Sequence, residues 1–290
     1  MTLGFIRPKT VGELLEVLAE YKDGSKIVAG ATDLLVQQRN SKQVEGKPLY
    51  LVDITGIPEL AYINVESGVV RIGAATTHRD IARSTVIQDV APFLADACLT
   101  VGSPQIRARG TIGGNIINAS PAADSLPPLA ALSAQVRLVS KRGSRDIAIC
   151  DFFKGPYKTV IEPGELLQEV FFKVPKNPGN CSFLKIGRRE AVAISRLSVA
   201  VLLDVDESGK ITEAAIAPGS CLPMPARIVR AEETLTGKVP DEETVEAAAN
   251  EVGEEMVRVS GVRWSTPYKK PVICALTRRA IWKALGVDVD

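Results

Sequence analysis

The chain has 290 residues, of which 46% are hydrophobic, enough to bury a large core in one big domain or in two to three smaller ones. Thirty-five basic and 34 acidic residues leave a net charge of +1, and without a long basic run this composition disfavours a nucleic-acid partner. Because the five cysteines form no CxxC pair or Cys/His group typical of metal ligation, we expect buried thiols. A signal-peptide pattern and long apolar stretches are also lacking, so we expect a soluble, cytoplasmic protein.

The N-terminal part predicts a helix, a strand and a small-residue loop in that order. Thr10 to Glu13 has the spacing of a capping box, and apolar residues follow it at helical spacing. Residues 26–29 predict a strand and residues 32–39 a short helix. The segment between them, Val28-Ala29-Gly30-Ala31-Thr32-Asp33, lets backbone N–H groups approach a pyrophosphate closely, although a tight turn without ligand is the alternative.

A second small-residue loop, Thr111-Ile112-Gly113-Gly114-Asn115, follows predicted strands at 49–54 and 69–74 and a predicted helix at 91–101. Its Gly-Gly pair costs backbone entropy, which a ligand contact would explain, whereas a simple loop crossing is the other interpretation. The two loops together favour a clamp that holds one dinucleotide from both sides. Neither the GxGxxG fingerprint nor the GxxxxGK[ST] phosphate loop occurs, so a different fold must carry the nucleotide.

The C-terminal part predicts strands followed by helices. That order is typical of an α+β layer with helices on one face of an antiparallel sheet. A segment with two prolines and a glycine, 173–180, is the best linker candidate. We therefore predict three parts, residues 1–55, 56–175 and 176–290. The strands are expected at 136–140, 146–149, 166–174, 181–186, 197–204 and 211–217, and the helices at 241–257 and 268–285.

Several polar and aromatic residues have a structural interpretation beside a functional one. Asp124 or Ser125 is expected to cap a helix over 126–132, a role compatible with ligand contact. His78, the only histidine, is expected on the surface at the start of an exposed helix. The charged run 185–190 is expected to be a solvated face, with a cation near an electron-rich ring or a partner as the alternative. The two tryptophans, Trp264 and Trp282, are expected to anchor the core or an interface.

Four segments carry a resemblance to a known family. They are residues 29–34, the run 102–107 continuing into 111–116, residues 120–124, and Phe183-Leu184-Lys185-Ile186-Gly187-Arg188-Arg189. In this order the chain resembles, over essentially its whole length, the FAD-binding medium subunit of the molybdenum hydroxylases, the group of xanthine, carbon monoxide and nicotinate dehydrogenases. In the first loop Ala31 stands where the family often has a second glycine, which is acceptable if its φ is negative.

The resemblance implies a cofactor, FAD, and a set of residues that bind it. The implied fold is a two-part FAD-binding region of the vanillyl-alcohol-oxidase type, followed by an α+β C-terminal domain with a three-stranded antiparallel sheet and a helical layer. The pyrophosphate would lie against Val28 to Leu34 and Gly113 to Asn115. The implied cofactor-binding residues are Val28, Ala29, Gly30, Ala31, Thr32, Asp33, Leu34, Thr111, Gly113, Gly114, Asn115, Ile117, Asp124, Leu167 and Lys185. Among them Thr111, Asn115, Ile117 and Asp124 would contact the ribityl or ring end, Leu167 would pack near the adenine, and Lys185 would approach the isoalloxazine.

Partners follow from the same resemblance. A small subunit with two [2Fe–2S] clusters would pass electrons from a molybdopterin-containing large subunit to the flavin, which hands them to NAD or another acceptor. The chain itself would hydroxylate no substrate and hold no metal. A stand-alone FAD-dependent reductase or oxidase and a flavin-free assembly scaffold are the alternatives. We find no residue that would protonate a substrate for the first of these.

Overall fold

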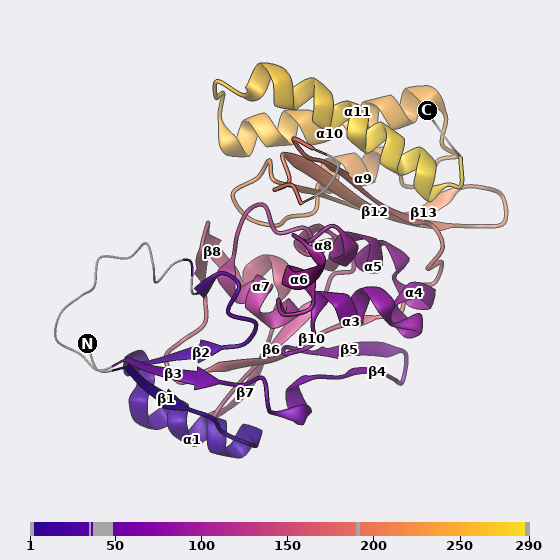
Figure 1. Ribbon diagram of the computed structural model, residues 1–290. Coiled ribbons are helices and arrows are strands. Elements are labelled where there is room, and N and C mark those ends of the chain that lie inside the picture. Colours follow the sequence, from indigo (N-terminus) through magenta and orange to yellow (C-terminus); the bar gives the residue numbers. More distant parts are fainter. Residues whose placement is uncertain (1–2, 35, 37–48, 190–191, 288–290) are drawn as a thin grey trace.

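Four β-sheets organise the part of the chain that a computed structural model describes, residues 3–34, 36, 49–189 and 192–287 (Figure 1). The first sheet is parallel, with α1 (Val11–Tyr21) and the 3₁₀ turn η1 (Lys22–Gly24) between two of its strands. The hydroxyl of Thr10 accepts a hydrogen bond from the Glu13 N–H at 3.1 Å, as the capping spacing predicts. In sheet order the strands are β1 (Leu3–Ile6), β3 (Leu49–Asp53) and β2 (Ser25–Val28), so β2 has a free edge.

The second sheet is antiparallel and forms the middle of the molecule. Its central strand, β10 (Leu166–Lys173), pairs with a strand on either side and buries Leu166, Leu167, Val170 and Phe172. A short 3₁₀ turn, η2 (Pro58–Leu60), leads into the first strand, and η3 (Ile149–Asp151) and the small ribbon of β8 (Phe153–Gly155) and β9 (Lys158–Thr159) precede β10. The sheet order is β4 (Ile63–Glu66), β5 (Val69–Gly73), β10, β6 (Gln135–Ser140) and β7 (Gly143–Ala148).

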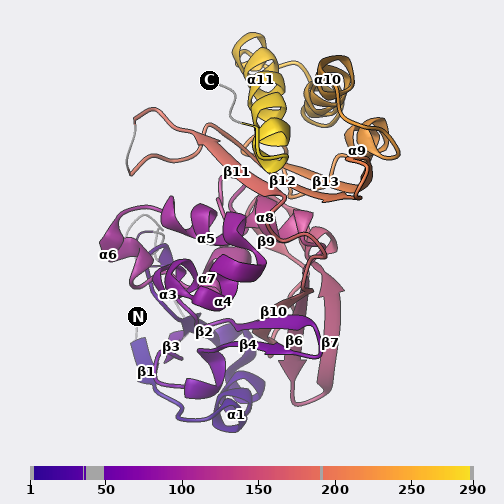
Figure 2. The same ribbon diagram turned by 90° about the vertical axis from the view of Figure 1, so that its right-hand side faces the viewer.

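A layer of short helices separates this sheet from the C-terminal part (Figures 1 and 2). These helices bury small and aromatic residues, and the largest cluster of buried residues joins them to β5 and β10 on one side and to β12 and β13 on the other. The helices are α3 (His78–Arg83), α4 (Thr85–Val90), α5 (Pro92–Leu99), α6 (Pro104–Arg107), α7 (Ile112–Asn118) and α8 (Leu126–Ala131).

The C-terminal part has an antiparallel sheet of β11 (Cys181–Ile186), β12 (Leu197–Val205) and β13 (Ile211–Gly219), with β12 in the centre. Three helices, α9 (Val229–Leu235), α10 (Glu242–Ser260) and α11 (Thr266–Ala284), cover the face that points away from α3–α8 (Figure 2). A second core cluster lies between this sheet and these helices. In the described part of the chain, no helix has both the length and the apolar character needed to cross a membrane.

Two expectations from the sequence need comment, and one strand was not predicted. Trp264 is 88% exposed, so of its two expected roles the core is wrong and the interface stays a prediction, whereas Trp282 packs against the second core cluster. The sequence did not reveal β1, because the strand has only four residues, too few for a periodic pattern, and its Phe5 is largely exposed. Half of the helix predicted at 32–39, residues 35 and 37–39, lies outside the described residues.

Candidate functional site

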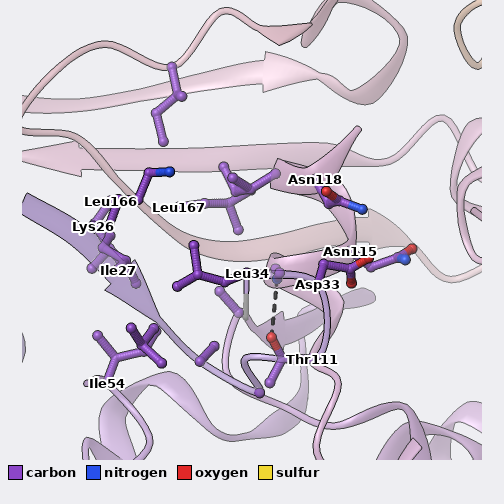
Figure 3. Close-up of a pocket in the computed structure, with 18 of the residues that line it drawn as sticks. Lys26, Ile27, Asp33, Leu34, Ile54, Thr111, Asn115, Asn118, Leu166 and Leu167 are labelled. Atoms are coloured by element: carbon purple, nitrogen blue, oxygen red, sulfur yellow. Dashed lines mark hydrogen bonds between the residues drawn. The ribbon is translucent and has the colours of Figure 1, made fainter. Parts of the chain in front are cut away.

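A large pocket lies between the first sheet and the segments α7 and β10 (Figure 3). Its volume is about 1020 Å³, at the upper end of the roughly 300–1,000 Å³ typical of small-molecule sites, so it has room for a dinucleotide. Of the cofactor-binding residues implied by the resemblance, all but Asp124 and Lys185 line it. They are Val28, Ala29, Gly30, Ala31, Thr32, Asp33, Leu34, Thr111, Gly113, Gly114, Asn115, Ile117 and Leu167.

The first small-residue loop follows β2 and touches the segment before α7. A Cβ on Gly30 would collide with the carbonyl oxygen of Arg109, so only glycine allows this approach. Ala31 has φ +59°, so the condition of a negative φ is not met and a non-glycine residue lies in the left-handed region. The N–H groups of Gly30 and Ala31 donate to no acceptor among the described residues. They are therefore available to an anion in the pocket.

The second small-residue segment is not a loop, as the sequence suggested, but the cap and first turns of α7. Thr111 is the N-cap residue, and its hydroxyl accepts the Gly114 N–H at 3.1 Å. The Gly113 N–H donates to the Ala74 carbonyl at 2.9 Å, and a Cβ on Gly113 would collide with Ala74. Tertiary packing against Ala74 thus overrides the low helix propensity of the glycine pair. It also means that these N–H groups already have protein acceptors.

At the α7 end of the pocket, the polar groups that face the cavity are side chains rather than backbone N–H groups. Figure 3 shows Thr111, Asn115 and Asn118 grouped near Asp33. The amide oxygen of Asn115 accepts the Ser125 hydroxyl at 2.7 Å, which orients the side chain and leaves its NH₂ group to donate elsewhere. Ser125 is the N-cap residue of α8, as expected, but neither its hydroxyl nor the Asp124 carboxylate makes a capping hydrogen bond, so the expected capping oxygen is wrong.

The opposite end of the pocket is formed by α1, η1, β2 and the turn that enters β10. Figure 3 places Lys26, Ile27 and Leu166 together on the side away from Asn115. Sequence reasoning missed most of this end, because its residues come from segments without a recognisable motif. The missed lining residues there are Leu18, Lys22, Asp23, Ser25, Lys26, Ile27, Ile161, Glu162, Pro163, Gly164, Glu165 and Leu166. Tyr157 was also missed, but it lies beside α7, where its N–H donates to the Ala119 carbonyl at 2.8 Å.

Asp124 and Lys185 form a buried ion pair with each other, outside the residues that line the pocket. The Lys185 Nζ lies 2.5 Å from Asp124 Oδ2 and 3.0 Å from the Thr100 carbonyl oxygen. Burial raises the pKa of the Asp124 carboxyl, and the neighbouring ammonium opposes that shift only in part. The pair connects β11 to the layer of short helices α3–α8. Only 11% of the Lys185 side chain is exposed, so a solvated face is the wrong interpretation for this lysine.

His78 is buried at the inner wall of the pocket, which corrects its expected surface position. Its backbone N–H donates to the Gly110 carbonyl at 3.0 Å, and its Nδ1 lies 3.5 Å from the Cys98 sulfur. Burial, with a smaller contribution from Arg107, lowers the pKa of His78 to about 4, so the imidazole is neutral at pH 7. The Thr77 hydroxyl caps α3 by accepting the Asp80 N–H, but nothing in the sequence indicated that the first residue of this helix is buried.

Two family models together match nearly all of the chain. The model described as the FAD binding domain in molybdopterin dehydrogenase matches residues 1–176. The model described as the CO dehydrogenase flavoprotein C-terminal domain matches residues 182–284.

Curated and solved proteins are similar over the full length. The chain is 34% identical to the nicotinate dehydrogenase FAD-subunit of Eubacterium barkeri, over 98% of this chain and 95% of that protein. It is 30% identical to the carbon monoxide dehydrogenase medium chain of Hydrogenophaga pseudoflava, over 94% of each. Among solved structures, a chain of the reconstituted CO dehydrogenase from Oligotropha carboxidovorans gives a TM-score of 0.89 at 26% identity, covering 99% of this chain and 98% of that one.

Proposed function

Because the chain belongs to the FAD-binding medium subunits of the molybdenum hydroxylase family, we propose that it passes electrons from [2Fe–2S] clusters of a partner subunit through FAD to NAD or another acceptor. Its relatives are medium subunits of heteromeric dehydrogenases. We propose the same setting here, with a small [2Fe–2S] subunit, a large molybdopterin subunit that holds the hydroxylation site, and a cytoplasmic location. One observation carries the proposal: a single pocket of dinucleotide size gathers both small-residue segments.

The residues that hold FAD are proposed from the chemistry of the pocket walls. The free N–H groups of Gly30 and Ala31 would bind the pyrophosphate, helped by the Thr111 hydroxyl and the Asn115 amide NH₂ across the pocket. Leu167 would pack near the adenine and Ile117 near the ribityl or ring end, as the resemblance implies. FAD, when bound, supplies the reversible electron-carrying ring system, for which the protein provides binding, orientation and electrostatics.

Asp124 and Lys185 are proposed to act beside the ring end as a pair. The second oxygen of Asp124, Oδ1, is buried without a hydrogen-bond partner in the described part of the chain, so it can accept a ligand hydroxyl after a small shift. Lys185 contributes one fixed positive charge to this region, where negative charge on a reduced ring would be stabilised. Their separation from the pocket lining means that this contact needs a local side-chain movement.

The three-part organisation supports the same proposal. We propose a vanillyl-alcohol-oxidase-type arrangement in which residues 1–55 and 56–175 form the two FAD-binding parts and 176–290 the C-terminal domain. The division follows the sheets, since each part contains one of the three larger ones. The pocket lies at the seam between the first two parts, so both are needed to complete it.

The first experiment is an absorbance spectrum of the purified chain before and after incubation with FAD, with identification of the nucleotide released by heat. About one FAD per chain, reduced by dithionite and reoxidised by an added acceptor such as NAD⁺, is the expected result. Folded protein that binds no flavin even in excess FAD would overturn the proposal for the isolated chain. Co-expression with subunits encoded nearby then tests whether reducing equivalents reach the flavin from a partner.

A further inference from the structure

The turn Ile161–Leu167 forms one wall at the end of the pocket away from Asn115, and a residue outside the pocket holds it in place. Pro163 and Gly164 occupy the middle of the turn, with Gly164 at φ +84° and the Glu165 N–H donating to the Glu162 carbonyl at 3.0 Å. This is the pattern of a type II turn. The turn packs against the end of α1, because a Cβ on Gly164 would lie 3.7 Å from the Leu18 carbonyl oxygen.

The carboxylate of Glu165 ties this turn to β7. Arg145 donates to it through two nitrogens, Nε to Oε1 and Nη2 to Oε2, each at 2.8 Å, and Nη2 also reaches the Val160 carbonyl at 3.1 Å. The Glu162 N–H donates to the same carboxylate at 2.8 Å. Only 6% of the Glu165 side chain is exposed, so the pair is of the bidentate, charge-assisted kind that fixes geometry. Arg145 therefore determines where the wall stands without lining the pocket itself.

The position of this wall relative to the rest of the pocket identifies the part of the ligand that it meets. The phosphate-binding groups proposed above lie at Gly30 and on α7, whereas the turn lies beside Leu166 and Lys26 at the far side (Figure 3). A dinucleotide whose pyrophosphate is held by Gly30 and α7 extends its adenosine half to one side of these groups and its flavin half to the other. Since Leu167 is the proposed adenine neighbour, the turn faces the adenosine half.

We propose that Arg145 and Glu165 are positioning residues that set the width of the adenosine end of the pocket. The proposal rests on the proposed function, because it assumes FAD as the ligand. It assigns the pair a selective role, in that recognition of the adenosine half depends on the turn and recognition of the flavin half does not.

The test compares the Arg145→Gln and Glu165→Gln variants of the full chain with the unmodified protein in titrations with FAD, ADP and FMN. We expect the Kd for FAD and ADP to rise at least 10-fold in both variants and the Kd for FMN, which lacks adenosine, to stay within 2-fold. Arg145→Lys keeps the positive charge but loses the planar guanidinium that donates through two nitrogens. We expect its affinity for FAD and ADP to lie between those of Arg145→Gln and the unmodified protein. Arg142→Gln is the matched control, because Arg142 pairs with Glu162 of the same turn at 3.0 Å but both side chains are exposed.

The outcomes separate the two proposals. An unmodified chain that binds neither FAD nor ADP contradicts the proposed function, whatever the variants do. Unchanged FAD and ADP affinities in Arg145→Gln and Glu165→Gln, or an equal loss of FMN affinity, contradict the positioning role while leaving the proposed function standing. If one variant unfolds, circular dichroism identifies it, and the other variant together with Arg145→Lys still decides the result.

Discussion

Gly30 rests against the carbonyl oxygen of Arg109, so closely that no side chain fits between the two backbones. This contact joins the two small-residue segments, which are about 80 positions apart in the sequence. The glycine is needed at this point to let one backbone approach another, and the pocket opens directly beside the contact. The clamp is therefore one continuous structure rather than two independent loops.

Replacing Gly30 by alanine is expected to push the first loop away from Arg109 and destroy the pocket entrance. The collision involves backbone atoms, so the cost is about 2–3 kcal/mol of folding free energy together with loss of FAD binding. Urea unfolding and FAD titration measure the two effects. Gly56→Ala is the matched control, because a Cβ there meets no heavy atom within 4 Å. Normal FAD binding by Gly30→Ala would contradict the role of this contact.

The neighbouring glycines of α7 are expected to separate folding from binding. A Cβ on Gly113 collides with Ala74, whereas a Cβ on Gly114 meets only the Thr111 hydroxyl oxygen at 3.0 Å and otherwise projects into the pocket. Gly113→Ala should therefore lower the thermal midpoint strongly. Gly114→Ala should keep the midpoint within a few degrees and lose FAD affinity by 10-fold or more. Equal losses of stability from the two changes would contradict the orientation of α7 in which Gly113 faces Ala74 and Gly114 faces the pocket.

Ala31→Gly is expected to stabilise the chain, because Ala31 has φ +59°. The left-handed conformation costs a non-glycine residue roughly 1–2 kcal/mol, which glycine removes. Glycine also loses about 0.5–1 kcal/mol of backbone entropy on folding, so the expected net gain in unfolding free energy is about 0.5–1 kcal/mol. The control is Ala29→Gly, since Ala29 lies in the same loop without a positive φ and should lose about 0.5–1 kcal/mol. The free energy of unfolding in urea, with and without FAD, gives both values. A less stable Ala31→Gly variant would contradict the expectation.

The small residues of the sequence identified two segments that line the pocket, whereas the positions of two titratable residues, His78 and Lys185, were predicted wrongly. Residues 28–34 and 111–117 are recognisable because close backbone approach demands glycine and alanine, and that demand is local. The burial of His78 and the pairing of Lys185 with Asp124 depend on which distant element covers them. The hydrophobic pattern of a helix as short as α3, which has six residues, does not show which distant element covers it. The Ile161–Leu167 wall escaped prediction for the same reason, since its geometry comes from Arg145 in another strand.

Local helix propensity also explains why the sequence predicted a loop where α7 lies. A Gly-Gly pair argues against a helix by propensity, but Thr111 caps this one and Ala74 packs against it. The capping threonine was present in the sequence and was the one signal that could have revealed the helix. The long helices α10 and α11 were recognised because residues at helical spacing recur along 19 residues each, for example Val245, Ala248 and Val252 in α10 and Ile273, Leu276 and Ala280 in α11.

Breaking the Lys185–Asp124 pair is expected to destabilise the contact between β11 and the layer of short helices α3–α8. Lys185→Met leaves a buried carboxylate without its cation, which costs about 3 kcal/mol, whereas the double change Lys185→Met/Asp124→Asn removes both charges and recovers part of that loss. Urea unfolding of the four proteins of this cycle gives the coupling. Lys270→Met is the control, because its pair with Glu254 is exposed and is expected to contribute under 1 kcal/mol. A coupling near zero would contradict the buried pair.

Stability is expected to fall as the pH drops from 6.5 towards 4, because of His78. Its folded-state pKa is about 4, below the ordinary histidine value of 6.5, so in this window the unfolded chain binds a proton that the folded chain excludes. The stabilisation is complete above pH 6.5 and reaches at most about 3 kcal/mol, at about 1.4 kcal/mol for each unit of pKa difference. Urea unfolding at pH 7.5 and pH 5.0 should differ by about 2 kcal/mol on this account alone. His78→Gln removes the titrating group, so its stability should change less between the two pH values, even if it is lower at both. An unchanged pH dependence in His78→Gln would assign the effect to carboxyl groups and contradict a buried, neutral imidazole beside Cys98.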